Sequence, residues 1–249
     1  MGTGTGDGLF LGALNLLGCF DLQQNSLRDL NAELHRQGDL LRDGGKADTE
    51  WEVLNPRGSH AVAVGVDGPL QITVCGSVGY YCGGMNQKGE IRIEGSAGPG
   101  VGENMMSGSI RVTGDASQYA GATGRGGLLV IEGNASSRCG ISSKGINIVV
   151  RGNVGHMSAF MAQSGNLVVL GDAGDALGDS IYEARLFVRG QVKSLGADCI
   201  KKEMREEHLR LLSDLLKAAE VTDVRPEEFT RYGSARELYH FDVDRADAY

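Results

Sequence analysis

The sequence predicts an all-β protein, a parallel β-solenoid (β-helix) with 19-residue coils and flanking terminal helices. Three observations carry this prediction: one glycine position repeats at a constant interval, aliphatic residues recur two and four positions before it, and a residue shortly after it is small. A unit of this kind buries its apolar face only by stacking on the next unit. The repeat glycines, each 19 residues from the next, are Gly76, Gly95, Gly114, Gly133, Gly152, Gly171 and Gly190.

The residues around each repeat glycine have the pattern of a strand that leads into a tight turn. Ile72 and Val74 precede Gly76, and every later coil has an aliphatic residue at both positions, as in a strand with one buried face. The residue directly after the glycine is polar, which is typical of turns whose side chains bond the nearby backbone. The position seven residues after the glycine holds only Gly or Ala, which predicts a crowded corner or unusual backbone torsions.

The composition indicates a soluble cytoplasmic protein and argues against two classes of partner. The chain has 39 glycines but only 4 prolines in 249 residues, a balance that favours many tight turns over disorder. A net charge of -8 opposes nucleic-acid binding, which requires a basic surface. No segment reaches the roughly 18 apolar residues of a membrane span. The five cysteines form no CxxC pair, which indicates reduced thiols and no zinc site.

The first 50 residues precede the regular repeat. Residues 1–26 are interpreted as a flexible extension or the product of a misplaced start. The apolar run Phe10–Phe20 ends close to a lipoprotein-like box at Cys19, but no Lys or Arg precedes it, as a signal peptide requires. Residues 27–50 are expected to form a helix, starting near Ser26, and a linker.

The repeat and a C-terminal region make up the rest of the chain. Residues 51–196 are expected to form the solenoid, with an imperfect first coil in which Val53 aligns with Ile72. Residues 197–249 are expected to contain an amphipathic helix over residues 198–219 and an aromatic docking tail. The tail's apolar residues are Phe229, Tyr232, Leu238, Tyr239, Phe241 and Tyr249.

Several features imitate reactive sites but lack the context that such sites need. The glycine-rich segment Gly121–Gly127 resembles a phosphate-binding loop, yet the next expected element is a strand, whereas a nucleotide loop leads into a helix. Cys82 and Cys139 share one apolar column and are expected to be buried. His156 is expected to line a turn, because no two histidines have metal-ligand spacing. We therefore expect no catalytic residue, cofactor-binding residue or metal ligand in this chain.

Two candidate interaction sites remain. Residues three positions before the repeat glycine face outward, and in the last four coils they are apolar, although monomers seldom expose such a surface. Either the chain's own terminal segments or a partner covers them. The corner segment containing Glu103, Asn104, Met105 and Met106 is the second candidate, with core filling as the alternative for its methionines. The outward apolar residues, called the outer strip, are Val130, Val149, Val168 and Phe187.

The repeated turns, such as Gly76-Ser77-Val78-Gly79, resemble the GXGXG domain at the C-terminus of the glutamate synthase large subunit. Over about residues 27–249, the chain also resembles the stand-alone GXGXG subunit of N-methylglutamate synthase. The segments that carry this second resemblance are Asn55-Pro56-Arg57-Gly58, Gly79-Tyr80-Tyr81-Cys82, Gly102–Gly108, Val154-Gly155-His156-Met157-Ser158 and Leu195-Gly196-Ala197-Asp198-Cys199.

The resemblance implies a right-handed β-helix within a hetero-oligomeric enzyme. Its partners would be a glutamine amidotransferase-like subunit and an FMN-binding synthase subunit that also holds the iron–sulfur cluster. In that family the β-helix holds the other two parts together and has none of the known catalytic residues. The implied reaction converts methylamine and glutamate into N-methylglutamate and ammonia. The alternatives are the equivalent subunit of a glutamate synthase of other substrate, or the β-helix subunit of formylmethanofuran dehydrogenase.

Overall fold

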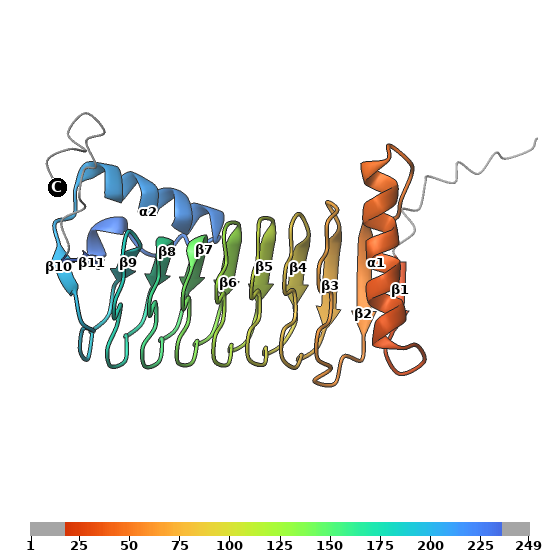
Figure 1. Ribbon diagram of the computed structural model, residues 1–249, viewed down its shortest axis with the longest axis horizontal. Coiled ribbons are helices and arrows are strands. Elements are labelled where there is room, and N and C mark those ends of the chain that lie inside the picture. The colour runs from red at the N-terminus through yellow and green to blue at the C-terminus, as the bar shows by residue number, and fades with distance from the viewer. Residues whose placement is uncertain (1–17, 236–249) are drawn as a thin grey trace, which may run out of the picture.

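The computed structural model describes residues 18–235, which form a single eleven-stranded sheet wound into a solenoid (Figure 1). Each strand of the repeating coils pairs in parallel with the next strand of the chain. The predicted β-solenoid with terminal helices is confirmed. The coil strands are β2 (Glu50–Leu54), β3 (Gln71–Cys75), β4 (Glu90–Ile93), β5 (Ser109–Val112), β6 (Leu128–Ile131), β7 (Lys144–Val150), β8 (Ser164–Val169) and β9 (Arg185–Val188).

The register reproduces the 19-residue period from β3 onward, apart from an irregularity at the start of β7. Ile72 lies opposite Ile91, which in turn lies opposite Ile110, and all three are buried in one continuous core. The aliphatic columns predicted from the sequence are therefore the inside of the solenoid. Stacking identical positions in this way lets every coil bury its apolar face against its neighbours.

The first coil is longer than the others. Val53 pairs with Val74 and Trp51 with Ile72, so the expected alignment of Val53 with Ile72 is wrong by two positions. A shift of two residues keeps each side chain on its own face of the strand, and both Trp51 and Val53 remain buried. The indole Nε1 of Trp51 donates a hydrogen bond to the carbonyl oxygen of Asp48, 2.9 Å away.

The repeat glycines are required because successive coils approach closely at the turn. The N–H of Gly133 donates to the carbonyl oxygen of Gly114 over 3.0 Å, and a β-carbon on Gly133 would lie 2.8 Å from that same oxygen. The later repeat glycines Gly152 and Gly171 have equivalent contacts. Only Gly76, at the start of the series, also has a positive φ. Lack of space, rather than an unusual torsion, therefore accounts for most of this column.

The Gly/Ala column combines crowding with unusual torsions, so both parts of that expectation are confirmed. Gly83 has φ +64°, and a β-carbon there would lie 2.6 Å from Cδ1 of Ile110. Ala159, in the same column, also has a left-handed backbone, with φ 58°. Side chains larger than a methyl group would project into the core from this position, which restricts the column to the two smallest residues.

The N-terminal end of the solenoid is closed by strand β1 (Gly18–Asp21) and helix α1 (Leu27–Arg42). The predicted helix start is confirmed, because Oγ of Ser26 accepts a hydrogen bond from the N–H of Asp29 over 3.1 Å. Leu30 and Leu34 of α1 are fully buried in the same cluster as the first coils. Figure 1 shows α1 lying across this end, where it covers a core that would otherwise face water.

The C-terminal end differs from the expected helix over residues 198–219. Cys199–Lys202 form strand β10, and helix α2 spans only Glu206–Ala218. Strand β11 (Thr230–Ser234), which comes after the short 3-10 helix η1 (Pro226–Glu228), pairs antiparallel with both β9 and β10. Pairing with a segment about thirty residues later thus overrides the local helical pattern and covers the sheet edge at β9.

The structure describes only part of the predicted aromatic docking tail and of the predicted N-terminal extension. In the docking tail, Phe229 is buried and Tyr232 half-buried. The tail residues Leu238, Tyr239, Phe241 and Tyr249 lie outside the described residues, as do residues 1–17 of the predicted extension.

Candidate interaction surfaces

The outer strip lies beneath α2, on the outer face of β6 to β9 (Figure 1). Val149, Val168 and Phe187 have no exposed surface, and Val130 is 2% exposed. Of the two possible covers, the chain's own C-terminal segment is the one observed, so the strip is not a free interface for a partner. The residues that cover the strip are Leu212, Leu215, Leu216, Ala219, Val221, Val224 and Phe229.

The C-terminal end of α2 is held by arginines on the outer face. Nη2 of Arg111 donates to the carbonyl oxygen of Ala219 over 3.1 Å, and the same side chain forms ion pairs with Glu132 and Glu220. A cation at this end of a helix also interacts favourably with the helix dipole. The sequence showed Arg111 as the last charged residue before the strip, but it did not show that Arg111 contacts a helix a hundred residues later. Within residues 18–235 the cover ends here, so the outer face of β3 and β4 is left uncovered by this part of the chain.

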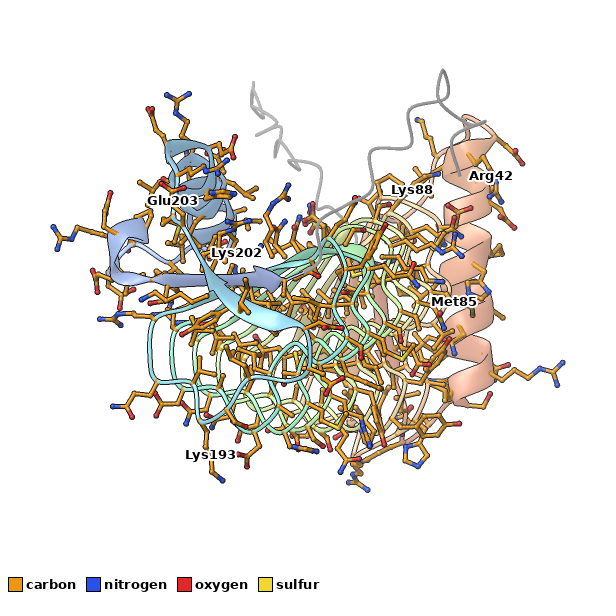
Figure 2. The ribbon with its side chains drawn as sticks, turned by 60° about the vertical axis from the view of Figure 1, so that its left-hand side comes forward. Arg42, Met85, Lys88, Lys193, Lys202 and Glu203 are labelled. Carbon is orange, nitrogen blue, oxygen red and sulfur yellow. The ribbon has the colours of Figure 1, made fainter. Side chains whose placement is uncertain are left out.

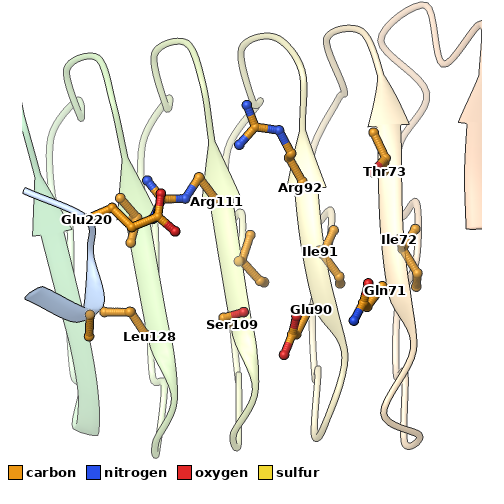
Figure 3. A pocket seen from close by; sticks show the side chains of 13 residues that line it. Gln71, Ile72, Thr73, Glu90, Ile91, Arg92, Ser109, Arg111, Leu128 and Glu220 are labelled. Carbon is orange, nitrogen blue, oxygen red and sulfur yellow. The ribbon is translucent and has the colours of Figure 1, made fainter. Parts of the chain in front are cut away.

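A groove of about 310 Å³ runs over the bare strands beside the end of α2 (Figure 3). Its polar and charged side chains on β3 to β5, apart from Arg111 beside α2, are called the open face, and Leu128 and Val130 of β6 form its apolar border. Arg92 is half exposed and lies 3.6 Å from Glu94, an ion pair that water screens. A shallow groove of mixed charge is typical of a polar protein interface rather than of an enclosed small-molecule site. The open face consists of Gln71, Thr73, Glu90, Arg92 and Ser109.

The predicted corner segment is a second surface, on the side of the solenoid where α1 lies and where Figure 2 labels Met85. Asn104 links neighbouring coils: its Nδ2 donates to Oη of Tyr81 over 3.2 Å, and its Oδ1 accepts from Oγ1 of Thr123 over 2.6 Å. Burial raises the pKa of the Glu103 carboxyl. Asn104 is therefore fixed by bonds to both neighbouring coils, and Glu103 lies partly buried beside it.

The two methionines of the corner segment have different roles. Met105 is fully buried in the core, whereas Met106 is 44% exposed. Tyr80 and Met85 are also about half exposed, and the sequence reasoning missed both of them. In the sequence, the sign of this exposed surface was that both residues have large apolar side chains at corner positions of the coil. Both residue types suit contacts with another protein. The methionine side chain is flexible and adapts its shape, and tyrosine combines an apolar ring with a polar hydroxyl group. The corner surface consists of Tyr80, Met85, Glu103, Asn104 and Met106.

Cys82 and Cys139 are buried and His156 lies in a turn, as the sequence predicted. Burial raises the pKa of the Cys82 and Cys139 thiols to about 12, which keeps them protonated and unreactive. His156 lies exposed in a turn. Between residues 18 and 235, no group of three or more His, Cys, Asp or Glu side chains is arranged to hold a metal ion.

The glycine-rich segment lies between two strands, and the chain's two described helices are short. Gly121–Gly127 connects β5 to β6, two strands, so it does not have the strand-to-helix geometry of a nucleotide loop. Neither helix in the described part of the chain is both long enough and apolar enough to cross a membrane.

Comparison with known proteins identifies one family. No family model matches the chain. The chain is 69% identical over 229 residues to Protein GlxC of Rhizobium meliloti (strain 1021), an alignment that covers 92% of this chain and 98% of that protein. Both chains are therefore matched over nearly their whole length. The chain belongs to the family of Protein GlxC.

Proposed function

We propose that this chain is the non-catalytic structural subunit of a heteromeric glutamate synthase-like complex, specifically N-methylglutamate synthase. In this complex it would hold together a glutamine amidotransferase-like subunit and a synthase subunit that carries FMN and an iron–sulfur cluster. The reaction of the complex is methylamine plus glutamate giving N-methylglutamate and ammonia. The likeness to Protein GlxC and the repeated Gly-x-Val/Ala-Gly turns support membership in this class.

The division of the outer sheet face is the observation that carries the proposal. The half over β6 to β9 is apolar and covered by α2, whereas the half over β3 to β5 is polar and, among the described residues, is covered only at its border by the end of α2. The two solenoid ends are also closed by the chain itself, through α1 at one end and β10 and β11 at the other. The remaining lateral surfaces are those on which a separate protein can dock without unfolding any part of this chain.

The open face and the corner surface differ in chemistry, which suits two different partners. The open face has charges of both signs, which favour specific but moderate association. The corner surface has exposed tyrosine and methionine side chains, which contribute apolar contact area. In this proposal each surface seats one of the two partner subunits.

Co-expression with the products of neighbouring amidotransferase-like and flavin-dependent synthase genes tests the proposal. We expect one complex containing all three chains in size-exclusion chromatography with light scattering, with the flavin absorbance in the synthase subunit. We expect the isolated chain to bind no FMN. The purified complex should form N-methylglutamate from methylamine and glutamate, as measured by mass spectrometry. A chain that stays separate from both proteins, or that retains flavin on its own, would contradict the proposal.

Paired surface variants then test the two docking sites. Met85→Asp with Met106→Asp should remove one partner, and Glu90→Arg with Arg92→Glu should weaken the other. Lys193→Glu is the control, since this exposed residue lies in a turn away from both surfaces (Figure 2). Loss of both partners in a single pair of substitutions, with the fold intact by circular dichroism, would show that the two surfaces are not separate sites.

A further inference from the structure

A basic hollow lies at the C-terminal end of the solenoid, where β9, β10 and β11 meet. It has a volume of about 410 Å³ and receives Arg185 from β9, Lys202 from β10 and Arg231 from β11. Lys202 and Arg231 are direct partners in the β10–β11 ladder, which fixes their side chains on one face. Figure 2 shows this end of the molecule with Lys202 labelled. Three cations in one hollow are unusual for a chain with a net charge of -8.

The charge of these cations is only partly offset within the described residues, by Glu207, which acts to raise the pKa of Arg231. Arg185, Lys202 and Arg231 form no ion pair with any residue in the range 18–235, although Glu183 also lines the hollow. Nη1 of Arg231 donates to the carbonyl oxygen of Glu203 over 3.0 Å. Its Nε is buried and has no acceptor. A buried donor without a partner is costly, so the guanidinium of Arg231 is held in this position at a cost in stability.

The electrostatic effects on neighbouring groups agree with a net positive field. The pKa of Arg231 is lowered by burial and then by the charges of Arg185 and Arg205, against the opposing effect of Glu207. The pKa of the nearby His208 is also lowered, by burial first and then by Arg231, Arg185 and Arg205, against the opposing effect of Glu207. Both groups therefore lie where the protein's own charges disfavour a further cation and favour an anion.

We propose that this hollow is an oxyanion-binding site that takes a carboxylate or phosphate group. The ligand oxygens accept hydrogen bonds from the guanidinium groups of Arg185 and Arg231, while Lys202 adds a point charge. Charge-assisted bonds from arginine to such groups are strong and directional. The hydroxyls of Ser164 and Tyr182 line the same hollow and are additional donors. The arrangement fits a small anion better than a large polyanion, because the carboxylate of Glu183 repels added negative charge.

Isothermal titration calorimetry of the full-length chain at low ionic strength tests this site. Sodium phosphate and sodium glutarate are the two probes, and sodium chloride at equal ionic strength is the reference. We expect saturable binding of at least one probe, weakened about tenfold or more by Arg185→Gln and by Lys202→Gln. The phosphate and glutarate titrations separate a phosphate site from a carboxylate site.

Arg210→Gln is the matched control, because Arg210 is an exposed arginine on α2 whose partner is Glu206. It should leave binding unchanged. Arg231→Gln is tested alongside, with circular dichroism to confirm folding. If it misfolds, Arg185→Gln and Lys202→Gln decide whether the hollow binds the anion. Binding that survives in Arg185→Gln and Lys202→Gln, or no binding beyond the chloride reference, overturns the proposal. The measurement needs no partner subunit, so its result is independent of complex assembly.

Discussion

The backbone N–H of Asn134 donates a hydrogen bond to Oδ1 of Asp115, 2.7 Å away in the preceding coil. The same bond recurs along the solenoid, so the polar residue after each of the first six repeat glycines accepts from the next coil rather than from its own turn. At this turn the backbone leaves the regular ladder, and the side chains supply the acceptors that the main chain lacks there. The residues linked in this series are Ser77, Ser96, Asp115, Asn134, Asn153, Asp172 and Gln191.

Removing one acceptor from this series should destabilise the protein modestly. We expect Asp115→Ala to lower the free energy of unfolding by about 1 kcal/mol, the usual net contribution of a partly exposed hydrogen bond. Asp115→Asn keeps an oxygen in place, as Asn134 and Asn153 do in later coils, and should be close to wild type. Urea unfolding followed by circular dichroism distinguishes the two. Equal stability of the alanine and asparagine variants would show that water replaces the bond at no cost.

Gly133→Ala tests the clearance between coils. The added methyl would lie 2.8 Å from the carbonyl oxygen of Gly114, so the backbone of one coil must shift. We expect a loss of about 1–3 kcal/mol, as for other overpacked sites. The matched control is Gly233→Ala, where the nearest atom is the flexible Cγ of Lys202 at 3.4 Å and φ is not positive. Thermal midpoints of the two variants should differ clearly; similar midpoints would mean that the coils separate easily.

The solenoid coils could be predicted because the sequence repeats with a constant period of 19 residues. The columns containing Gly133 and Gly83 were visible because each coil repeats the same physical constraint, lack of space in one case and crowding with a left-handed torsion in the other. The start of α1 was visible because an N-cap is a local hydrogen bond of Ser26. The two-residue offset of Val53 was hidden, since no repeat glycine marks the first coil.

Features that depend on distant segments were not predictable from local patterns. Cys199–Lys202 has helical spacing, yet it becomes a strand because β11 is available to pair with it. The cover over the outer strip depends on where α2 docks, and Arg111 contributes to that position from a strand far away in sequence. The basic hollow combines Arg185, Lys202 and Arg231, three residues from three separate strands. No spacing rule connects them.

Charged substitutions in the outer strip should release α2. We expect Val149→Asp with Phe187→Asp to lower the free energy of unfolding by at least about 3 kcal/mol, because both side chains are fully buried against α2 and a carboxylate there is unpaired. Hydrogen exchange should accelerate first in α2, since the strip faces away from the solenoid core.

Arg92→Asn is the control for the outer strip, because Arg92 occupies the same outward column beyond the end of α2. It is half exposed, and its replacement should change the free energy of unfolding by no more than about 0.5 kcal/mol. If the strip variant kept both its stability and the slow exchange of α2, the packing of this helix on β6 to β9 would contribute nothing to the fold.

The buried thiols should make stability fall at alkaline pH. Cys82 and Cys139 have pKa values of about 12 in the folded chain because of burial, above the ordinary 9.0 of an exposed thiol. The unfolded chain therefore releases two protons above pH 9 that the folded chain keeps, so this contribution is complete below pH 9 and is lost as the pH rises toward 12. We expect a loss of up to about 1.4 kcal/mol per thiol for each pH unit in that window.

Urea unfolding between about pH 8 and about pH 11 measures this loss, with Cys82→Ala and Cys139→Ala combined as the reference. The double variant starts from lower stability, because each substitution leaves a small cavity, but its stability should depend less steeply on pH. Cys19, which is exposed, should react with a thiol reagent in the folded protein, whereas Cys82 and Cys139 should react only after unfolding. Equal pH slopes in the wild-type protein and the double variant would show that other groups, rather than these two thiols, govern the alkaline transition.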